Sequence, residues 1–258
     1  MSASVLTTDL SSHLALITGA TGGIGKATCL TLAALGCSIA VHYNSASDTA
    51  ATLVTDLKAK GVRAQAFQAD LSTYDGVRTL HAAVVAAMGN PSILFNNAGL
   101  TLGKSGVQSI QDISIEDFEA TWRANCGTAY LLTQLCLPSM EEKSFGRIIF
   151  CSSVAGFTGG VVGPHYASSK SAMHGLVHWL AGNVAKKGIT VNGVAPALIE
   201  DTKMLPGGQG EGAGGLRARI PVGRLGRPEE IAETVCWMVK TGYVTNKVIA
   251  VDGGWFIQ

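Results

Sequence analysis

HLALITGATGGIG, residues 13–25, is the stretch that decides the fold, because it runs from an apolar segment directly into a cluster of glycines. The residues before Thr18 are apolar enough to predict a buried strand, and the amphipathic residues after Gly25 predict a helix. Glycines between a strand and a helix let the backbone turn sharply and approach a pyrophosphate, whose charge is met by the N–H groups and dipole of the helix start. We therefore predict a phosphate-binding turn rather than an ordinary tight turn.

Short apolar runs and longer amphipathic stretches alternate along the rest of the chain. This alternation implies right-handed crossovers and a parallel sheet covered on both faces. We therefore predict an α/β fold, a single doubly wound Rossmann domain over residues 1–258 with a sheet of about seven strands and ligands at the strands' carboxyl ends. The expected strands are His13–Thr18, Ser38–Tyr43, Ala64–Gln68, Ser92–Asn96, Arg147–Cys151, Ile189–Val194 and Val248–Val251. The expected helices are Gly25–Leu35, Ala50–Lys60, Tyr74–Met88, Ile115–Leu137, His165–Lys186 and Pro228–Val239.

Composition narrows the classes of partner. Hydrophobic residues make up 47% of the chain and charged residues 14%, which provides for a large core and for buried subunit contacts. The 19 Lys and Arg residues nearly balance the 18 Asp and Glu residues, so no overall positive field attracts nucleic acid or anionic lipid. No apolar stretch reaches the roughly 18 residues that span a bilayer. We expect neither a nucleic acid nor a membrane as partner.

Cysteine and histidine spacing gives no sign of a metal or a disulfide framework. The six cysteines are scattered and include no CxxC pair. The first residues contain no Arg, include Asp9 and lack the apolar core of a secretory leader, so we expect a cytoplasmic protein with free thiols. His174 and His178 have the spacing of metal ligands on a helix, but no third ligand is evident, and we expect no metal site.

One segment differs from the rest in composition. Leu205–Gly215 contains six glycines in eleven residues, and such a run holds a helix poorly. It is either a disordered surface loop or, because it lies between the sixth expected strand and the Pro228 helix, a substrate lid over about residues 203–220. Both interpretations stay open.

Tyr166 and Lys170 carry the clearest chemical signal. They lie four residues apart on an expected helix, so their side chains share one face about one turn apart. A phenol with its usual pKa near 10 is a slow acid–base group at neutral pH, but a nearby ammonium favours the phenolate and lowers that pKa. Ser153 follows the carboxyl end of an expected strand, where its hydroxyl can bond a substrate oxygen close to the phenol.

Further motifs accompany this pair in a fixed order along the chain. They are Thr18-Gly19 with Gly23 and Gly25, Asp70 in QADLS, Asn96-Asn97-Ala98-Gly99, Asn125, Ser153, the Tyr166 and Lys170 of YxxxK, Val191–Pro196, Gly226–Ala232 and Val251–Gly254. Together they resemble the short-chain dehydrogenase/reductase family over essentially the whole chain, and within it the 3-oxoacyl-[acyl-carrier-protein] reductases and related carbonyl reductases. The resemblance implies reversible, nicotinamide-dependent reduction of a ketone to a secondary alcohol.

The resemblance also implies roles for individual residues. Tyr166 acts as acid in reduction and as base in oxidation, Lys170 also holds the nicotinamide ribose, Asn125 continues a proton relay through water, and Ser153 fixes the substrate oxygen. The expected catalytic residues are Asn125, Ser153, Tyr166 and Lys170. The expected cofactor contacts are Gly19, Thr21, Gly23, Ile24, Gly25, Tyr43, Asn44, Ser45, Asp70, Leu71, Asn97, Ala98, Gly99, Tyr166, Lys170, Pro196, Ile199 and Thr202.

The end of the second expected strand bears on which nicotinamide binds. An NAD site normally places a carboxylate there, about 20 residues after the glycines. This chain has HYNS, residues 42–45, and no carboxylate that would repel a 2′-phosphate, so NADP(H) is favoured. NAD(H) remains the alternative, because Gly22 stands where many NADP-using relatives carry a basic residue. Pro196-Ala197 in place of Pro-Gly, and Thr202 one residue later than usual, are departures from the family pattern.

Apolar or adaptable residues are expected around the substrate. They are Phe157, Val161, His165, Leu205 and Leu216, beside Ser153 and Tyr166. The expected partner is a small carbonyl or alcohol, and the expected assembly is a homotetramer or homodimer. An NAD-dependent alcohol dehydrogenase of the same family and a non-catalytic dinucleotide-binding sensor remain the alternatives. A sugar-nucleotide epimerase usually has TGxxGxxG and a longer chain, and CSSVA at residues 151–155 is no serine-hydrolase elbow.

Overall fold

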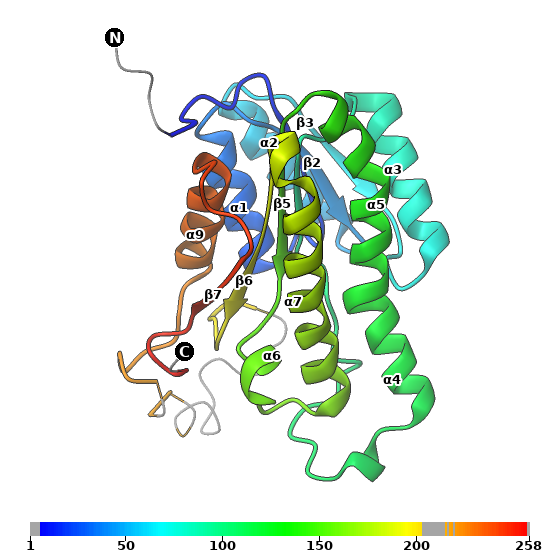
Figure 1. Ribbon diagram of the computed structural model, residues 1–258, viewed down its shortest axis with the longest axis vertical. Coiled ribbons are helices and arrows are strands. Elements are labelled where there is room, and N and C mark those ends of the chain that lie inside the picture. The colour runs from blue at the N-terminus through cyan, green and yellow to red at the C-terminus, as the bar shows by residue number, and fades with distance from the viewer. Residues whose placement is uncertain (1–5, 203–214, 216, 219, 257–258) are drawn as a thin grey trace.

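Seven apolar runs pair side by side as parallel strands and form one sheet (Figure 1). The computed structural model describes residues 6–202, 215, 217–218 and 220–256. The sheet has the order β3-β2-β1-β4-β5-β6-β7, which confirms the doubly wound parallel fold expected from the sequence. The strands are β1 Leu14–Ile17, β2 Ser38–Tyr43, β3 Ala64–Gln68, β4 Ile93–Asn96, β5 Gly146–Cys151, β6 Ile189–Pro196 and β7 Lys247–Val251.

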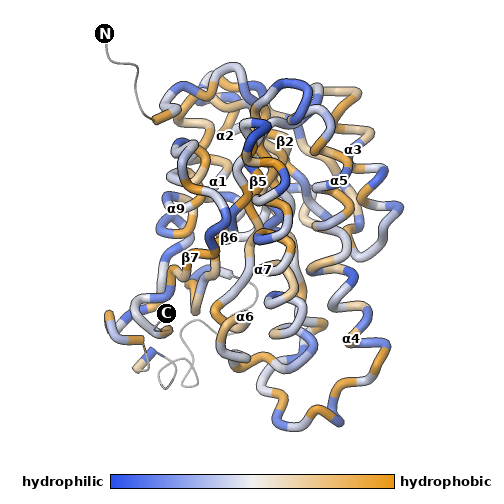
Figure 2. The backbone as a smooth tube through the Cα atoms, viewed as in Figure 1, coloured by the Kyte–Doolittle hydropathy of each residue, from blue (hydrophilic) through white to orange (hydrophobic). Residues whose placement is uncertain are grey.

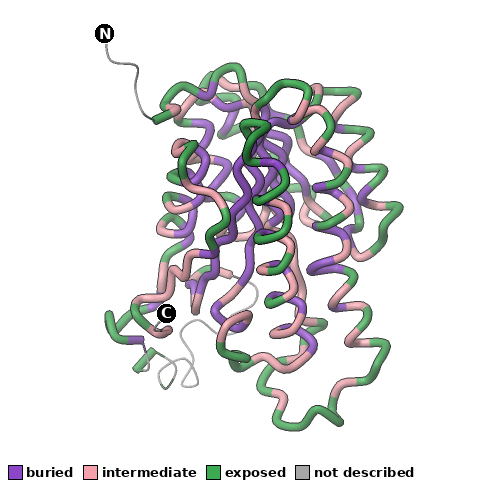
Figure 3. The backbone as a smooth tube through the Cα atoms, in the orientation of Figure 1, coloured by how far each residue is buried: buried purple, intermediate pink, exposed green. Residues whose placement is uncertain are grey.

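Helices cover both faces of this sheet, which is why its central strands are apolar throughout. Every residue of β6 is buried, and so is every residue of β5. Parallel strands covered on both faces read as continuous apolar runs rather than as alternating ones. Figure 2 shows the hydrophobic colour concentrated in the sheet and on the inward sides of the helices, and Figure 3 shows the same segments as buried.

The helices divide into two layers. One core cluster joins the sheet to α1, α2 and α9, and a second joins it to α3, α5 and α7 on the opposite face (Figure 1). Among the described residues no helix combines the length and the apolar character needed to cross a bilayer. The helices are α1 Gly23–Ala33, α2 Ser47–Ala59, α3 Tyr74–Met88, α4 Ile115–Trp122, α5 Thr128–Glu142, α6 Ala155–Thr158, α7 Pro164–Val184 and α9 Pro228–Lys240.

The single helix predicted over Ile115–Leu137 is wrong in one respect. The chain forms α4, then a π-helical turn at Arg123–Gly127, and then α5, which continues to Glu142. A π-helical turn inserts an extra residue into the helical ladder and rotates the face that follows. Apolar periodicity is too coarse to reveal an insertion this short.

The strand order creates a crevice at the carboxyl ends of the strands. After β1 the chain moves outward to β2 and β3 and then returns to β4 on the other side of β1. Loops from β1 and β4 therefore leave in opposite directions, and ligands of open α/β sheets bind at such a switch point. The motif residues quoted above follow these strand ends.

Candidate active site

A cavity of about 800 Å³ runs along the carboxyl ends of the strands. Its lining includes residues that follow each of the seven strands, from β3 at one edge of the sheet to β7 at the other. The structure thus brings most of the expected site residues together. Those that line the cavity are Gly19, Thr21, Gly23, Ile24, Gly25, Asn44, Ser45, Asp70, Leu71, Asn97, Ala98, Gly99, Ser153, Val161, Tyr166, Lys170, Pro196, Ile199 and Thr202.

The glycine turn between β1 and α1 leaves no room for a side chain at Gly23 or Gly25. Gly19 has a φ of +61°, a conformation that L side chains rarely adopt. A Cβ on Gly25 would collide with the carbonyl oxygen of Gly19 and lie 2.8 Å from the Cα of Ala20. A Cβ on Gly23 would lie 2.7 Å from the carbonyl oxygen of Asp201. Bare backbone at the start of α1 is the surface that fits a pyrophosphate.

His42, which the sequence analysis did not assign to the site, supports this turn. The backbone N–H of Gly19 donates to its Nδ1 at 2.9 Å, and its Nε2 lies 3.1 Å from the carbonyl oxygen of Ala69. Burial lowers the pKa of His42 to about 4, so the ring is neutral at pH 7, with Nδ1 as acceptor and Nε2 as donor. Alternation along β2 could not have revealed it, because Ile39 to His42 are all buried and both faces of the strand are covered.

Tyr43, by contrast, is not brought to the cavity. It is partly buried against the core cluster that contains Ile39 and Val41. Successive strand residues point to opposite faces, so the side chain next to His42 must face away from it. Tyr43 is therefore not among the residues that line the cavity, and its contact with a cofactor stays a prediction.

A short hydrogen-bond network joins the ends of β1 and β4. Thr18 Oγ1 accepts from the backbone N–H groups of Asn97 and Ala98, each at 2.9 Å. Asn97 Nδ2 donates to the Thr18 carbonyl oxygen at 2.9 Å. These bonds hold the two diverging loops in a fixed relation, which assigns Thr18 a supporting place in the site.

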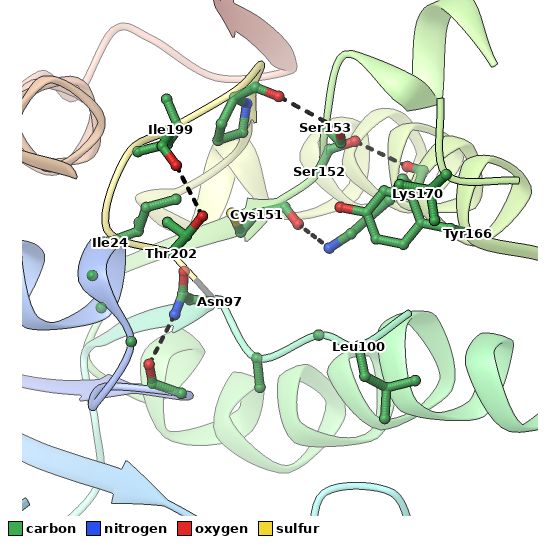
Figure 4. Close-up of a pocket in the computed structure, with 18 of the residues that line it drawn as sticks. Ile24, Asn97, Leu100, Cys151, Ser152, Ser153, Tyr166, Lys170, Ile199 and Thr202 are labelled. Atoms are coloured by element: carbon green, nitrogen blue, oxygen red, sulfur yellow. Dashed lines mark hydrogen bonds between the residues drawn. The ribbon is translucent and has the colours of Figure 1, made fainter. Parts of the chain in front are cut away.

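Tyr166, Lys170 and Ser153 converge at the end of β5. Tyr166 and Lys170 are both buried on α7, and the Lys170 Nζ lies 5.5 Å from the centroid of the Tyr166 ring. Lys170 Nζ also donates to the Cys151 carbonyl oxygen at 2.7 Å (Figure 4). A hydrogen bond links the Ser153 and Tyr166 side chains. A phenol, an ammonium and a hydroxyl therefore share one wall of the cavity.

The acid–base state of this cluster differs from the expectation. Burial raises the pKa of Tyr166 well above its usual value, and the nearby Cys151 thiol acts in the same direction, whereas the hydrogen bond with Ser153 opposes the rise. Burial likewise lowers the pKa of Lys170. Desolvation is the largest effect on both groups, so the lowering of the phenol's pKa that the sequence predicts does not prevail in this structure.

Asn125 lies in the π-helical turn, and its side chain is fully engaged. Its Oδ1 accepts from the Leu100 N–H at 2.8 Å, and its Nδ2 donates to the Leu100 carbonyl oxygen and to Ser169 Oγ, each at 3.0 Å. Ser169 Oγ in turn donates to the Tyr166 carbonyl oxygen at 2.7 Å. Asn125 thus ties the loop after β4 to the helix that carries Tyr166, and its own side chain does not line the cavity.

Comparison with known proteins agrees with this arrangement. A family profile described as short chain dehydrogenase matches residues 13–209. This chain belongs to the short-chain dehydrogenase/reductase family. It is 37% identical over 248 residues to the "Uncharacterized oxidoreductase YmfI" of Bacillus subtilis (strain 168), covering 93% of this chain and 98% of that protein.

Two further similarities extend over the same length. The chain is 36% identical over 254 residues to the "3-oxoacyl-[acyl-carrier-protein] reductase FabG" of Pseudomonas aeruginosa, covering 97% of this chain and 100% of that protein. A solved structure, a blue fluorescent protein from a metagenomic library in complex with NADPH, is 36% identical and has a TM-score of 0.88 over 96% of this chain and 99% of the other. This short-chain dehydrogenase/reductase is an NAD(P)-dependent oxidoreductase.

Two predicted substrate residues of this short-chain dehydrogenase/reductase face away from the cavity. Phe157 stacks on Phe256 with ring centroids 5.0 Å apart, and its other neighbour is His174 at 4.4 Å. His165 is fully buried, with Nε2 3.3 Å from the Thr101 carbonyl oxygen. Adjacent helix residues point about 100° apart, so His165 turns away where Tyr166 turns in. Neither side chain is among the residues that line the cavity, and their contact with a substrate stays a prediction.

Other predictions cannot be placed. Leu205, Leu216 and most of the expected glycine-rich lid at 203–220 lie outside the described residues. Among the residues that the structure describes, no group of three or more potential metal-binding side chains occurs, and His174 instead lies 2.8 Å from Ser152 Oγ through its Nε2.

The clearest omission of the sequence analysis is Trp255. It lines the cavity from the turn that follows β7, near the end of the chain. The Val251–Gly254 motif directly precedes it, so the strand end was visible in the sequence, but nothing in the spacing indicates that the next side chain enters the site.

Proposed function

We propose that this short-chain dehydrogenase/reductase uses NADPH to reduce a ketone to a secondary alcohol, reversibly, with Tyr166 as the group that donates the proton. The observation that carries the proposal is the convergence of Tyr166, Ser153 and Lys170 on one wall of a cavity whose other wall is a bare glycine turn. A phenol hydrogen-bonded to a hydroxyl is suited to hold a carbonyl oxygen and to protonate it as charge develops there.

The residues present fit a dinucleotide. The turn at Gly19, Gly23 and Gly25 would hold its pyrophosphate, and its nicotinamide, when bound, supplies hydride to the carbonyl carbon. Ser153 Oγ would orient the carbonyl oxygen, and Tyr166 Oη would donate its proton to that oxygen. A phenol, whose pKa burial raises further in Tyr166, is protonated at neutral pH, and this is the form that reduction requires.

Lys170 and Asn125 have supporting parts in this proposal. An ammonium has three donors, so the bond from Lys170 to the Cys151 carbonyl oxygen leaves capacity for ribose hydroxyls. The same bond keeps the positive charge beside Tyr166, where it would favour the phenolate formed after proton donation. Since the Asn125 side chain is engaged with Leu100 and Ser169, its part in a proton relay would come through its backbone carbonyl.

The preference for NADPH rests on the end of β2. Asn44, Ser45 and Ala46 line the cavity there, and none of them carries the carboxylate that would repel a 2′-phosphate. The 36% identical structure in complex with NADPH supports the same choice. Introducing a carboxylate by Asn44→Asp should weaken NADPH binding about tenfold or more and leave NADH binding little changed, because like charges at short range repel.

The substrate class and the assembly are also proposals. Similarity to the FabG of Pseudomonas aeruginosa supports a 3-oxoacyl thioester or a related neutral ketone. We propose a homotetramer or homodimer that acts in the cytoplasm. The exposed aromatic side chains of Tyr130 on α5 and Trp179 on α7 support subunit contact, because large apolar surfaces on helices favour burial.

The absorbance of the reduced nicotinamide tests the proposal. The purified protein is mixed with NADPH or NADH and with acetoacetyl thioesters, β-keto esters and aryl ketones. We expect NADPH oxidation with at least one neutral ketone and a lower rate with NADH. A higher kcat/KM with NADH would replace the cofactor proposal with an NAD-dependent alcohol dehydrogenase. NADPH binding without turnover of any ketone would support a dinucleotide sensor instead.

A further inference from the structure

The turn after β7 is held in place by one carboxylate and by the chain beside it. Asp252 Oδ1 accepts from the Gly254 N–H at 2.9 Å, and its Oδ2 accepts from the Phe256 N–H at 2.8 Å. Gly253 and Gly254 have φ values of +65° and +87°, which suit a tight reversal. The Val222 N–H donates to the Gly253 carbonyl oxygen at 3.1 Å. The direction of Trp255 is therefore set by local bonds.

An aromatic stack connects this turn to the catalytic segment. The Phe256 ring is nearly parallel to that of Phe157, at an interplanar angle of 13°. Phe157 contacts His174, whose Nε2 lies 2.8 Å from Ser152 Oγ, next to Ser153. Stacked aromatic pairs add about 0.5–1.5 kcal/mol beyond the burial of their area. The turn that carries Trp255 is thus fixed against the wall that carries Ser153.

The strand order assigns Trp255 to the end of the cavity away from the phosphate turn. Asn44 and Asp70 follow β2 and β3 at one side of the sheet, whereas Trp255 follows β7 at the opposite edge. Tyr166 lies between them, at the end of β5. A dinucleotide that extends from Asn44 past Tyr166 to the residues after β6 leaves the end of the cavity at Trp255 for the substrate.

Charged side chains are few among the described residues that line the cavity. Among the described lining residues only Asp70 and Lys170 carry charge at pH 7, since His42 is neutral. Asp70 lies at the far edge, and Lys170 bonds the Cys151 carbonyl oxygen. Besides Trp255, the lining of the cavity includes the apolar residues Val154, Ala155, Val161, Val162 and Leu198, which follow β5 and β6 or lie in the segment before α7. Apart from Lys170, the described lining residues offer no cation to a free carboxylate or phosphate, which would lose hydration on entering the cavity.

We propose that Trp255 is a specificity-determining residue that contacts the neutral, apolar substituent of the ketone, and that flat or aryl substituents gain most from it. This inference rests on the proposed ketone reduction and adds the substrate class. The indole offers a large, rigid apolar face that a substrate can contact. The cavity, at about 800 Å³, still has room for a substrate beside it. Phe256, which does not itself line the cavity, is a positioning residue for the indole.

The test compares two neutral substrates and one acid. Ethyl benzoylacetate carries an aryl group next to the ketone, ethyl acetoacetate carries a methyl group, and acetoacetate carries a free carboxylate. We expect the native protein to reduce the aryl ester with the lowest KM and the acid least well. Trp255→Ala should raise the KM of the aryl ester about tenfold and change that of the methyl ester less than about threefold. Trp255→Phe should leave the KM of the aryl ester close to its native value.

Two further variants separate contact from general damage. Phe256→Leu should raise the KM of the aryl ester by a smaller factor, with kcat and the KM of NADPH unchanged. Tyr243→Ala, which removes a fully exposed aromatic side chain, should alter none of these constants. Equal changes for both esters in Trp255→Ala, or none, would overturn the inference and leave ketone reduction intact. Failure of the native protein to reduce any ketone would overturn the proposed function and this inference together.

Discussion

The two ends of the cavity are built in different ways. At the phosphate end, neighbouring strands supply backbone that is fixed by hydrogen bonds, such as those of Thr18 with Asn97 and of Gly19 with His42. At the substrate end, segments that are far apart in the chain meet through side-chain packing, as Phe157 meets Phe256. The first end depends on exact backbone geometry, whereas the second depends on the shape of a few side chains, so substitutions should affect the two ends in different ways.

The largest effect is expected where a side chain would enter the glycine turn. A methyl group on Gly25 would collide with the backbone of Gly19 and Ala20, in the turn that follows β1. We expect Gly25→Ala to weaken the free energy of NADPH binding by about 3 kcal/mol or more, which lowers the NADPH affinity about 100-fold or more. Gly22→Ala is the matched control, because its nearest neighbour would be 3.4 Å away, and it should bind NADPH almost normally. Fluorescence titration with NADPH measures both, and equal affinities would contradict the proposed turn.

The next effect concerns His42 and pH. Its pKa is about 4 in the folded chain and near 6.5 when unfolded, so the unfolded state binds the proton first as the pH falls. Stability should be complete above about pH 6.5, decrease towards about pH 4 by at most about 3 kcal/mol, and then level off. Urea unfolding at several pH values measures this slope. His42→Asn should make it shallower, and an unchanged slope would exclude His42 as the cause.

A smaller effect is expected at the junction between the two ends. Asn125→Ala leaves the Leu100 backbone groups without their side-chain partners, and we expect a loss of about 2 kcal/mol of unfolding free energy. Ser169→Ala removes only the bonds to Asn125 and to the Tyr166 carbonyl oxygen and should cost about 1 kcal/mol. Thermal unfolding shows which of the two variants is less stable. A greater loss of stability in Ser169→Ala than in Asn125→Ala would contradict the assigned bonds.

The smallest effect is expected at Tyr43. Because this side chain packs against the core rather than lining the cavity, Tyr43→Phe should change NADPH affinity less than about twofold. Titration of Tyr43→Phe and of Asn44→Asp with NADPH compares the affinities of variants at two adjacent residues. A large loss of affinity in Tyr43→Phe would mean that its hydroxyl reaches the cofactor after all.

The phosphate end was largely predictable because spacing along one strand and the next turn determines it. Gly19, Gly23 and Gly25 could be assigned from their position between a strand and a helix, and the structure brings all three to the cavity. Tyr166 and Lys170 followed from the geometry of one helix turn. The seven strands were predicted for the same reason, since a buried parallel strand is a short apolar run.

The substrate end was not predictable in the same way. Phe157 and His165 are close to Ser153 and Tyr166 in the sequence, but their rings pack against Phe256 and the loop at Thr101. Trp255 was missed because its place depends on how the last turn folds back on the sheet. The π-helical turn at Asn125 and the raised pKa of Tyr166 likewise depend on tertiary packing, which local sequence patterns do not reveal.

The most direct test of the proposed chemistry measures binding and turnover in one variant, Tyr166→Phe. The variant keeps the ring and removes the hydroxyl, so the cavity and the glycine turn should be preserved. We predict that its NADPH affinity stays within about threefold of the native value, while kcat with a reducible ketone falls by about 10² to 10⁴-fold. A kcat within tenfold of the native value would contradict the assignment of Tyr166 as the proton donor.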